Sequence, residues 1–288
     1  MIRWILFVVL CFIWGSSFIL MKWGLNALTP YEIAGLRMIS AGIVLLPFFP
    51  QAWRHSTPKV RLFTILIGML GSFIPAIFFC IAETSLNSSV AAILNATTPL
   101  FVVLVGLIFF HRSAGVMQIS GVVVGFLGVL LLFYPSLSEE NHVFSSKSLL
   151  VLMATIMYGF NVNIANCHLL QTKPLHIAAL SFVLLIPLDL SLLVQQGFPA
   201  RDFYSIHVQK AVLASVVLGV FGTATATWLF YVLMKKAGPL FSAMVTYGIP
   251  FVAIGWGLLD GEEVGYLSLL ALLLILAGVY LANKKKSP

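Results

Sequence analysis

The chain has 288 residues, of which 60% are hydrophobic and only 9% are charged, and its formal net charge is +7. Average soluble domains carry roughly 25% charged residues, so this composition excludes a water-soluble surface. Apolar runs of about 20 residues, the length that crosses a hydrocarbon core, recur along the whole chain. Because these runs are continuous rather than alternating, the pattern indicates membrane-spanning helices and excludes a β-barrel.

The apolar runs predict an all-α membrane protein with ten transmembrane helices. The first run follows Arg3 and continues to about Trp23 without a signal-peptide cleavage site, which indicates an uncleaved first span. The connections are short and leave no room for a soluble domain. In chain order, the predicted spans are 4–24, 31–50, 62–82, 89–110, 115–134, 147–168, 176–195, 211–233, 239–259 and 266–283.

Basic residues gather in the loops on the N-terminal side of the predicted spans. These loops hold eleven of the sixteen Lys and Arg residues and no acidic residue. Because an excess of Lys and Arg marks the cytoplasmic side, both termini are predicted to be cytoplasmic, in a multi-pass protein of the bacterial inner membrane. The positive charge therefore reflects topology and contact with membrane lipids, and nucleic-acid binding is not expected.

The chain contains an internal repeat. Pro99 and Pro250 lie near the middle of the fourth and ninth predicted spans, 151 positions apart. Trp14-Gly15 and Tyr158-Gly159 lie in the first and sixth spans, 144 positions apart. Spans one to five therefore correspond to spans six to ten.

Five is an odd number, so the two halves enter the membrane with opposite orientation. This inverted arrangement predicts a first five-helix repeat at 1–134, an outer linker at 135–146 and a second five-helix repeat at 147–288. Many secondary transporters share this construction, and their site lies near the midplane where the repeats meet.

Several motifs, in the same order as the spans, are similar to those of one family. They are Trp14-Gly15-Ser16-Ser17-Phe18 with Lys22, Ala34-Gly35-Leu36-Arg37 with Ala41, the proline-bearing stretches 88–99 and 238–250, and the closing stretches Gly125-Phe126-Leu127-Gly128-Val129 and Ile275-Leu276-Ala277-Gly278-Val279. With them the chain resembles the drug/metabolite transporter superfamily, specifically its ten-span EamA-type members, over essentially its whole length.

The resemblance implies a carrier that moves small metabolites by alternating access, and many members of the superfamily export amino acids or related solutes. One departure concerns the glutamate that usually follows each proline-bearing span. Glu262-Glu263 fits that pattern in the second half, but His111-Arg112 takes the place in the first half.

Few ionisable residues lie inside or near the spans: Lys22, Arg37, Glu83, His168 and Asp189. Each costs roughly 2.5–3.5 kcal/mol at a helix centre, so such groups usually face protein or a wet cavity. Lys22 and Arg37 are candidates for holding a substrate carboxylate; alternatively they pair with Glu32 or Glu83 as an outer latch, or Lys22 snorkels to the interface. Asp189 is interpreted as a proton-coupling carboxylate, as the partner of a basic residue, or as an interfacial residue.

Three amides lie close together in the sixth predicted span. Asn163 and Asn166 are three positions apart and share a helix face, and Asn161 adds a third amide on an adjacent face. Ser17 and Lys22 occupy the positions in the first span that match Asn161 and Asn166. Amides in hydrocarbon need partners, which either a polar cavity or a neighbouring helix supplies. The cavity is the preferred interpretation.

Two further groups complete the candidate site. Trp14 and Tyr158 lie too deep for an interfacial belt, so they either wall a site or pack in the core. The polar residues near the repeat prolines either line the site or satisfy carbonyls that proline frees. The predicted substrate-binding set is Trp14, Ser17, Lys22, Arg37, Asn95, Thr98, Tyr158, Asn163, Asn166, Thr246 and Tyr247.

The favoured function is a secondary transporter that exports small organic metabolites. No catalytic residue, cofactor or metal ion is expected, because the chain has no H-E-x-x-H, no G-x-S-x-G and no P-loop sequence. The alternatives are an intramembrane enzyme acting on a lipid-borne substrate, and a channel or signalling membrane scaffold. Coupling to a proton or to a counter-substrate is compatible with the sequence, as is either a monomer or an oligomer.

Overall fold

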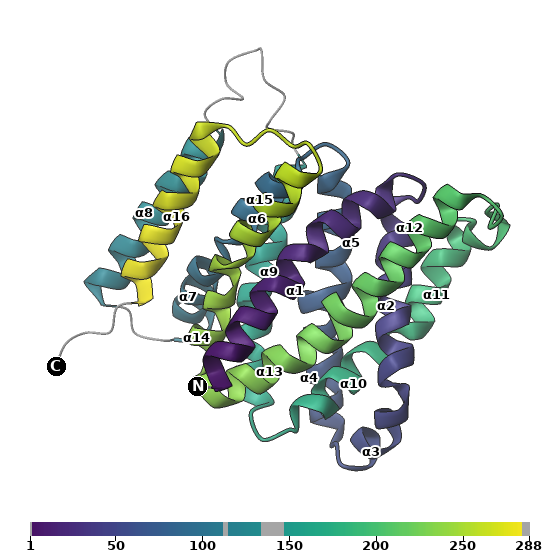
Figure 1. Cartoon of the computed structure of the whole chain (residues 1–288). Coiled ribbons are helices and arrows are strands. Elements are labelled where there is room, and N and C mark those ends of the chain that lie inside the picture. The colour runs from purple at the N-terminus through teal and green to yellow at the C-terminus, as the bar shows by residue number, and fades with distance from the viewer. Residues whose placement is uncertain (1, 112–114, 134–146, 284–288) are drawn as a thin grey trace.

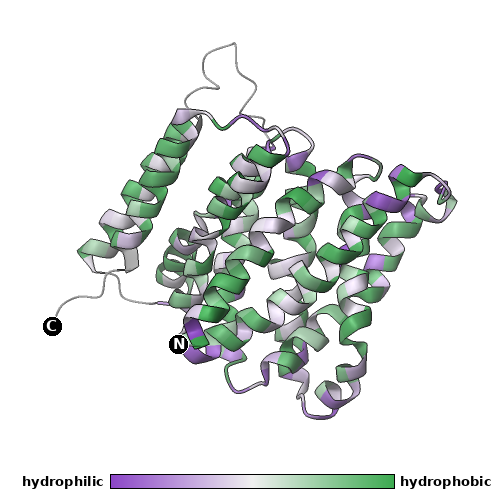
Figure 2. Ribbon diagram, viewed as in Figure 1, coloured by the Kyte–Doolittle hydropathy of each residue, from purple (hydrophilic) through white to green (hydrophobic). Residues whose placement is uncertain are grey.

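The computed structural model describes residues 2–111, 115–133 and 147–283, and the backbone in these ranges is helical with short turns and without a strand. The helices run back and forth between two ends of one bundle (Figure 1). Hydrophobic residues cover their length, whereas polar residues gather in the turns at the two ends (Figure 2). Because a bilayer offers no hydrogen-bond partner to an exposed backbone, such apolar segments must be helical. The chain is an all-α integral membrane protein.

Each predicted span overlaps with one α-helix or with two consecutive α-helices. They are α1 (Ile2–Leu25), α2 (Pro30–Leu45) with α3 (Phe49–Arg54), α4 (Pro58–Gly68) with α5 (Ile74–Glu83), α6 (Ser88–Asn95) with α7 (Thr98–Phe109), α8 (Val116–Phe133), α9 (Ser148–His168), α10 (Pro174–Val183) with α11 (Ile186–Gln195), α12 (Ile206–Val217) with α13 (Ala226–Ala237), α14 (Pro239–Ala243) with α15 (Ile249–Leu259), and α16 (Tyr266–Asn283). In the described part of the chain, eight helical segments are long and apolar enough to cross a membrane. The fifth and tenth predicted spans fall on α8 and α16, whose apolar segments are shorter.

Five spans change their helical geometry near the middle, one of them between α10 and α11. A π-helical turn joins α4 to α5 at Met69–Phe73, and another joins α12 to α13 at Leu218–Thr225. The span of α6 and α7 breaks just before Pro99, and a 3-10 turn at Met244–Tyr247 precedes Pro250. Proline has no N–H and its ring clashes with the carbonyl one turn back, so the α-helix cannot continue. These breaks lie at similar depth in the bundle.

Hydroxyl groups bond to backbone carbonyls at the breaks before Pro99 and Pro250. Thr98 Oγ1 donates to the carbonyl of Asn95 at 2.7 Å, and Thr246 Oγ1 donates to the carbonyl of Ala243 at 2.9 Å. The carbonyl of Asn95 is the one that Pro99 leaves without its helical partner, so the Thr98 bond satisfies it locally inside the membrane. The breaks are therefore stable features that leave non-helical backbone at mid-span.

Helices α8 and α16 pack against each other and stand beside the other helices (Figure 1). Glycine permits their close approach. A Cβ on Gly278 would meet the backbone nitrogen of Gly125, and it would lie 2.6 Å from the carbonyl oxygen of Gly121. Small residues allow this kind of backbone contact between membrane helices.

We expect Gly278→Ala to lower stability in detergent by about 1–3 kcal/mol, because overpacking of a tight contact costs that amount. The measurement is the thermal unfolding midpoint of the purified protein. Gly255→Ala is the matched control, because no atom lies within 4 Å of a Cβ placed there. Equal unfolding midpoints for the two variants would contradict the close contact of α8 with α16.

The outer linker expected at 135–146 lies outside the described residues, as does the Lys284-Lys285-Lys286 tail. The turn between α15 and α16 is described, and it brings Asp260 and Glu262 to the end of the bundle where α1 ends.

Candidate functional site

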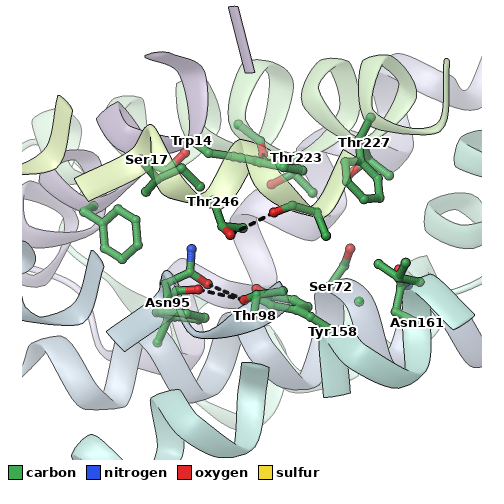
Figure 3. A pocket seen from close by; sticks show the side chains of 18 of the residues that line it. Trp14, Ser17, Ser72, Asn95, Thr98, Tyr158, Asn161, Thr223, Thr227 and Thr246 are labelled. Atoms are coloured by element: carbon green, nitrogen blue, oxygen red, sulfur yellow. Dashed lines mark hydrogen bonds between the residues drawn. The ribbon is translucent and has the colours of Figure 1, made fainter. Parts of the chain in front are cut away.

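A cavity of about 120 Å³ lies in the middle of the bundle, where the interrupted spans meet (Figure 3). Its walls come from α1, α2, α9, α6 and the segments around the π-helical turns Met69–Phe73 and Leu218–Thr225 and the 3-10 turn Met244–Tyr247. The lining residues are Trp14, Ser17, Phe18, Met21, Arg37, Gly71, Ser72, Phe79, Asn95, Thr98, Tyr158, Asn161, Val162, Gly222, Thr223, Thr227, Phe230, Tyr231, Ala243, Thr246 and Ile249.

Aromatic rings form much of the wall and hold one another in place. Trp14 Nε1 donates to the carbonyl of Gly222 at 3.0 Å, and the Trp14 ring lies 5.4 Å from that of Phe230. On the other side, Phe79 stacks on Tyr158 with ring centroids 6.2 Å apart. Fixed rings of this kind suit an amphipathic organic solute.

Arg37 is the only charged side chain among the described residues that line the cavity. Its Nε donates to Thr223 Oγ1 at 3.1 Å, and one terminal nitrogen lies 3.6 Å from Met21 Sδ, a weak acceptor. Arg37 takes part in none of the ion pairs found among the described residues. Its guanidinium therefore keeps N–H groups that can donate hydrogen bonds to a carboxylate ligand.

Neutral polar groups complete the lining. Asn161 Nδ2 donates to the carbonyl of Ile67 at 2.8 Å, next to the π-helical turn that ends at Phe73. Ser17 Oγ donates to the carbonyl of Ile13 at 2.9 Å. Each group is anchored in the protein, so it presents its remaining hydrogen-bonding capacity in a fixed direction.

At the end of the bundle where α1 ends, three charged residues form what we call the Lys22 cluster: Lys22, Asp260 and Glu262. Lys22 Nζ lies 2.6 Å from Asp260 Oδ2 and 3.0 Å from Glu262 Oε1. The Glu262 carboxylate also accepts from the backbone N–H groups of Ser88 and Ser89, at 3.0 and 3.1 Å, and from the Ser89 hydroxyl at 2.8 Å. The cluster thus joins α1, the start of α6 and the turn after α15, all on one side of the cavity.

The carboxylates of the Lys22 cluster are ionised at neutral pH. Burial raises the pKa of Glu262, but hydrogen bonds from Ser89 and Lys22 outweigh burial and hold this pKa below its usual value. Hydrogen bonds from Lys22 and Trp23 lower the pKa of Asp260. A carboxylate at a helix N-terminus also benefits from the helix dipole.

Seven residues of the predicted substrate-binding set line the cavity: Trp14, Ser17, Arg37, Asn95, Thr98, Tyr158 and Thr246. The other four lie outside the lining. Lys22 belongs to the Lys22 cluster, and Asn163 donates to the carbonyls of Val102 and Gly159 at 2.9 and 2.8 Å, between α9 and α7. Asn166 is half-buried near the end of α9, and Tyr247 packs against the core.

The lining also contains polar and aromatic residues outside the predicted set, including Ser72, Asn161, Thr223 and Phe230. A sequence signal for them exists. Asn161 matches Ser17 at the 144-residue spacing, and Thr223 and Phe230 match Ser72 and Phe79 at the 151-residue spacing. These positions can be found in the sequence by asking where both positions related by the repeat spacing carry a polar or aromatic residue.

Broken helices around a mid-bundle cavity, in an all-helical membrane protein, are the general construction of secondary transporters. The comparisons with known proteins agree. The sequence profile described as the EamA-like transporter family matches residues 2–134 and, separately, residues 145–284. The chain therefore belongs to the EamA-like transporter family and is a membrane transporter.

Individual relatives are similar over nearly the whole chain. A Salmonella typhimurium protein named "Probable amino-acid metabolite efflux pump" is 26% identical over 93% of this chain and 90% of its own length. An Escherichia coli K12 protein, named "Uncharacterized inner membrane transporter YedA", is 25% identical over 95% of this chain and 88% of its own. One crystal structure, 15% identical, superposes with a TM-score of 0.64 and covers 98% of this chain and 96% of the other. That likeness concerns the fold.

Proposed function

We propose that the chain is a secondary transporter that exports small organic metabolites, amino acids or related solutes, across the inner membrane by alternating access. One observation carries the substrate class. The cavity combines aromatic walls with one cationic side chain, Arg37, which has no carboxylate partner among the described residues. An Arg guanidinium binds carboxylates with paired, charge-assisted hydrogen bonds. The name of the Salmonella relative supports the same class and the direction of transport.

The proposed architecture is ten spans arranged as two inverted repeats, 1–134 and 147–288, with both termini in the cytoplasm. Two matches of the family profile, in the two halves of the chain, support it. The paired π-helical turns and the paired breaks before Pro99 and Pro250 support it as well. On this topology α8 and α16 are the closing spans of the two repeats.

The composition of the cavity gives further support. Sixteen of its twenty-one lining residues form eight pairs. In each pair, one residue lies in the first half of the chain, and the other lies at the matching position of the second half. The pairs are Trp14 with Tyr158, Ser17 with Asn161 and Phe18 with Val162 at 144 positions, and Gly71 with Gly222, Ser72 with Thr223, Phe79 with Phe230, Asn95 with Thr246 and Thr98 with Ile249 at 151 positions. Arg37 has no such partner, because Ser181 occupies the matching position and lies outside the lining. The charge is therefore a specific addition to a pseudo-symmetric chamber.

The Lys22 cluster gives alternating access a mechanism at one end. Glu262 belongs to the second half, whereas Lys22 and the N–H groups of α6 belong to the first. Closing these contacts shuts that end of the cavity, and breaking them lets the halves separate. The proposed topology places this end outside the cell. The matching position to Glu262 in the first half is His111, so the opposite end has no equivalent carboxylate there.

Counterflow in proteoliposomes tests the proposal. Vesicles loaded with one unlabelled amino acid at high concentration are diluted into the same labelled amino acid, and the test is repeated for N-acyl derivatives and other small carboxylates. We expect transient, saturable accumulation for at least one carboxylate that has an apolar side chain. Protein-free liposomes are the control. Flux that is not stimulated by the internal solute would indicate a channel, and absence of flux across the library would refute the proposed substrate class.

A further inference from the structure

Glu83 is a buried carboxyl group that the proposed transport site does not use. It is the last residue of α5, one turn beyond Phe79, whose ring lines the cavity. The residue is 8% exposed, and neither carboxyl oxygen has a hydrogen-bond partner among the described residues. Burying an ionised carboxylate without a partner costs several kcal/mol. The structure therefore holds an acid in a position that suits its neutral form.

The charged and titratable groups around Glu83 come from every side. They are Lys22 on α1, Arg37 on α2, Cys80 on α5 itself, Lys147 at the start of α9, and Glu262 in the turn after α15, while Tyr158 on α9 lies near Arg37 and Cys80. The π-helical turn Met69–Phe73 and α6 also pack against α5, and neither carries a titratable side chain. Only Lys22, Lys147 and Arg37 are cations.

These cations differ in how they are held. Lys22 already bridges Asp260 and Glu262 at 2.6 and 3.0 Å. Lys147 is half-buried and donates to the Thr84 and Ser85 hydroxyls at the end of α5. Arg37 is in no ion pair in the described part of the chain, and its contacts with Thr223 and Met21 are to neutral acceptors. If Glu83 loses its proton, Arg37 is the cation that can pair with the carboxylate while giving up the weakest contacts, because it would break no ion pair.

We propose that Glu83 is a proton-binding site that controls the availability of Arg37. A proton taken from solution onto the Glu83 carboxylate leaves Arg37 in the cavity, as in this structure. When that proton returns to solution, Arg37 pairs with Glu83 and no longer donates hydrogen bonds to a ligand in the cavity. Proton and substrate anion therefore bind together and cross together. The proton site stands on its own, whereas its link to transport rests on the proposed role of Arg37.

Infrared titration of the purified protein in lipid tests the proton site without any substrate. The band of a protonated carboxyl group is followed from about pH 5 to about pH 9, a range in which an ordinary glutamate stays ionised. We expect a band that Glu83→Gln removes. In Arg37→Gln the same band should persist to a pH higher by at least about one unit, because its ionised form has lost its cation.

Asp189→Asn is the matched control, because Asp189 is also buried with both oxygens unpartnered but lies on α11, away from the cavity. Its band should not respond to Arg37→Gln. Two results would overturn the proposal: carboxyl bands unaffected by Glu83→Gln, or a Glu83 band that titrates identically with and without Arg37.

A second measurement tests the link to transport. Counterflow of an equimolar mixture of labelled amino acids is measured against pH, equal on both sides of the membrane. In the unmodified protein the apparent affinity should fall at least about fivefold as pH rises through the titration of Glu83, a usual size for linked binding. Glu83→Gln should keep the acid-pH affinity throughout, while Asp189→Asn keeps the original profile.

The two measurements separate the possible failures. A flat pH profile in the unmodified protein, or an unchanged profile in Glu83→Gln, overturns the linkage. If the mixture shows no counterflow at any pH, the proposed substrate class fails, and the infrared titration alone still decides whether Glu83 binds a proton under the control of Arg37.

Discussion

Arg37→Gln is expected to reduce counterflow of a carboxylate substrate by about tenfold to about a hundredfold while the protein still folds. A hydrogen bond to a charged group contributes about 1.5–3 kcal/mol, and each 1.4 kcal/mol is a factor of about ten in affinity. Arg37 is the only cation among the described lining residues, so no neighbouring side chain in that lining can replace it. The loss should appear in the apparent affinity, measured as the concentration dependence of counterflow in proteoliposomes.

Two variants control this prediction. Arg54→Gln makes the same chemical change at an exposed residue at the end of α3, so its transport should be unchanged. Arg37→Lys keeps the charge but loses the planar fork that binds a carboxylate with two bonds, so it should fall between Arg37→Gln and the unmodified protein. Equal transport by Arg37→Gln and the unmodified protein would remove Arg37 from the site.

The sequence was sufficient for the helices because hydrophobic length is a local property. The predicted range 89–110, for example, falls on α6 and α7 (88–109), and the break between them lies beside Pro99, as proline chemistry requires. The π-helical turns could not be foreseen. No residue type enforces the widened turn that ends at Thr225, and it depends on how α2 packs against that segment.

The cavity was predictable only in part, because helical facing is a tertiary property. Asn161 and Asn163 are two positions apart and chemically identical. Asn161 lines the cavity, whereas Asn163 donates to the carbonyl of Val102 on the neighbouring helix α7. A residue spacing of two turns side chains to different faces, but it does not say which face meets the cavity. Lys22 shows the same limit, since its partners Asp260 and Glu262 are more than 230 positions away.

The second large effect is expected from Glu262→Gln, which should open the end of the bundle where we propose that the Lys22 cluster keeps the two halves together. The Glu262 side chain is 3% exposed and receives Lys22 together with two backbone N–H groups of α6. Removing one partner of a buried, hydrogen-bonded charge pair costs about 2–5 kcal/mol. The ratio of closed to open molecules should therefore fall by a factor of about 30 or more.

Electron–electron distance measurements on a cysteine-free background report this opening directly. Spin labels are attached at Asn26, just past α1, and at Leu259, at the end of α15, both of which are exposed. The unmodified protein should give one short distance, and Glu262→Gln should add a population at longer distance. Glu263→Gln is the matched control, because Glu263 is the exposed neighbour of Glu262. A distance distribution that Glu262→Gln leaves unchanged would contradict the role of the cluster.

Acidification should reproduce the effect of Glu262→Gln in the unmodified protein. The pKa of Glu262 is held below its ordinary value of 4.5, and that of Asp260 below 3.8. A lowered pKa stabilises the closed state fully above the ordinary value, and this contribution is lost as the pH falls through the lowered one. The short distance should therefore dominate from neutral pH down to about pH 5 and give way to the longer one only below about pH 4. Opening that is complete at a higher pH would mean that a different group holds this end closed.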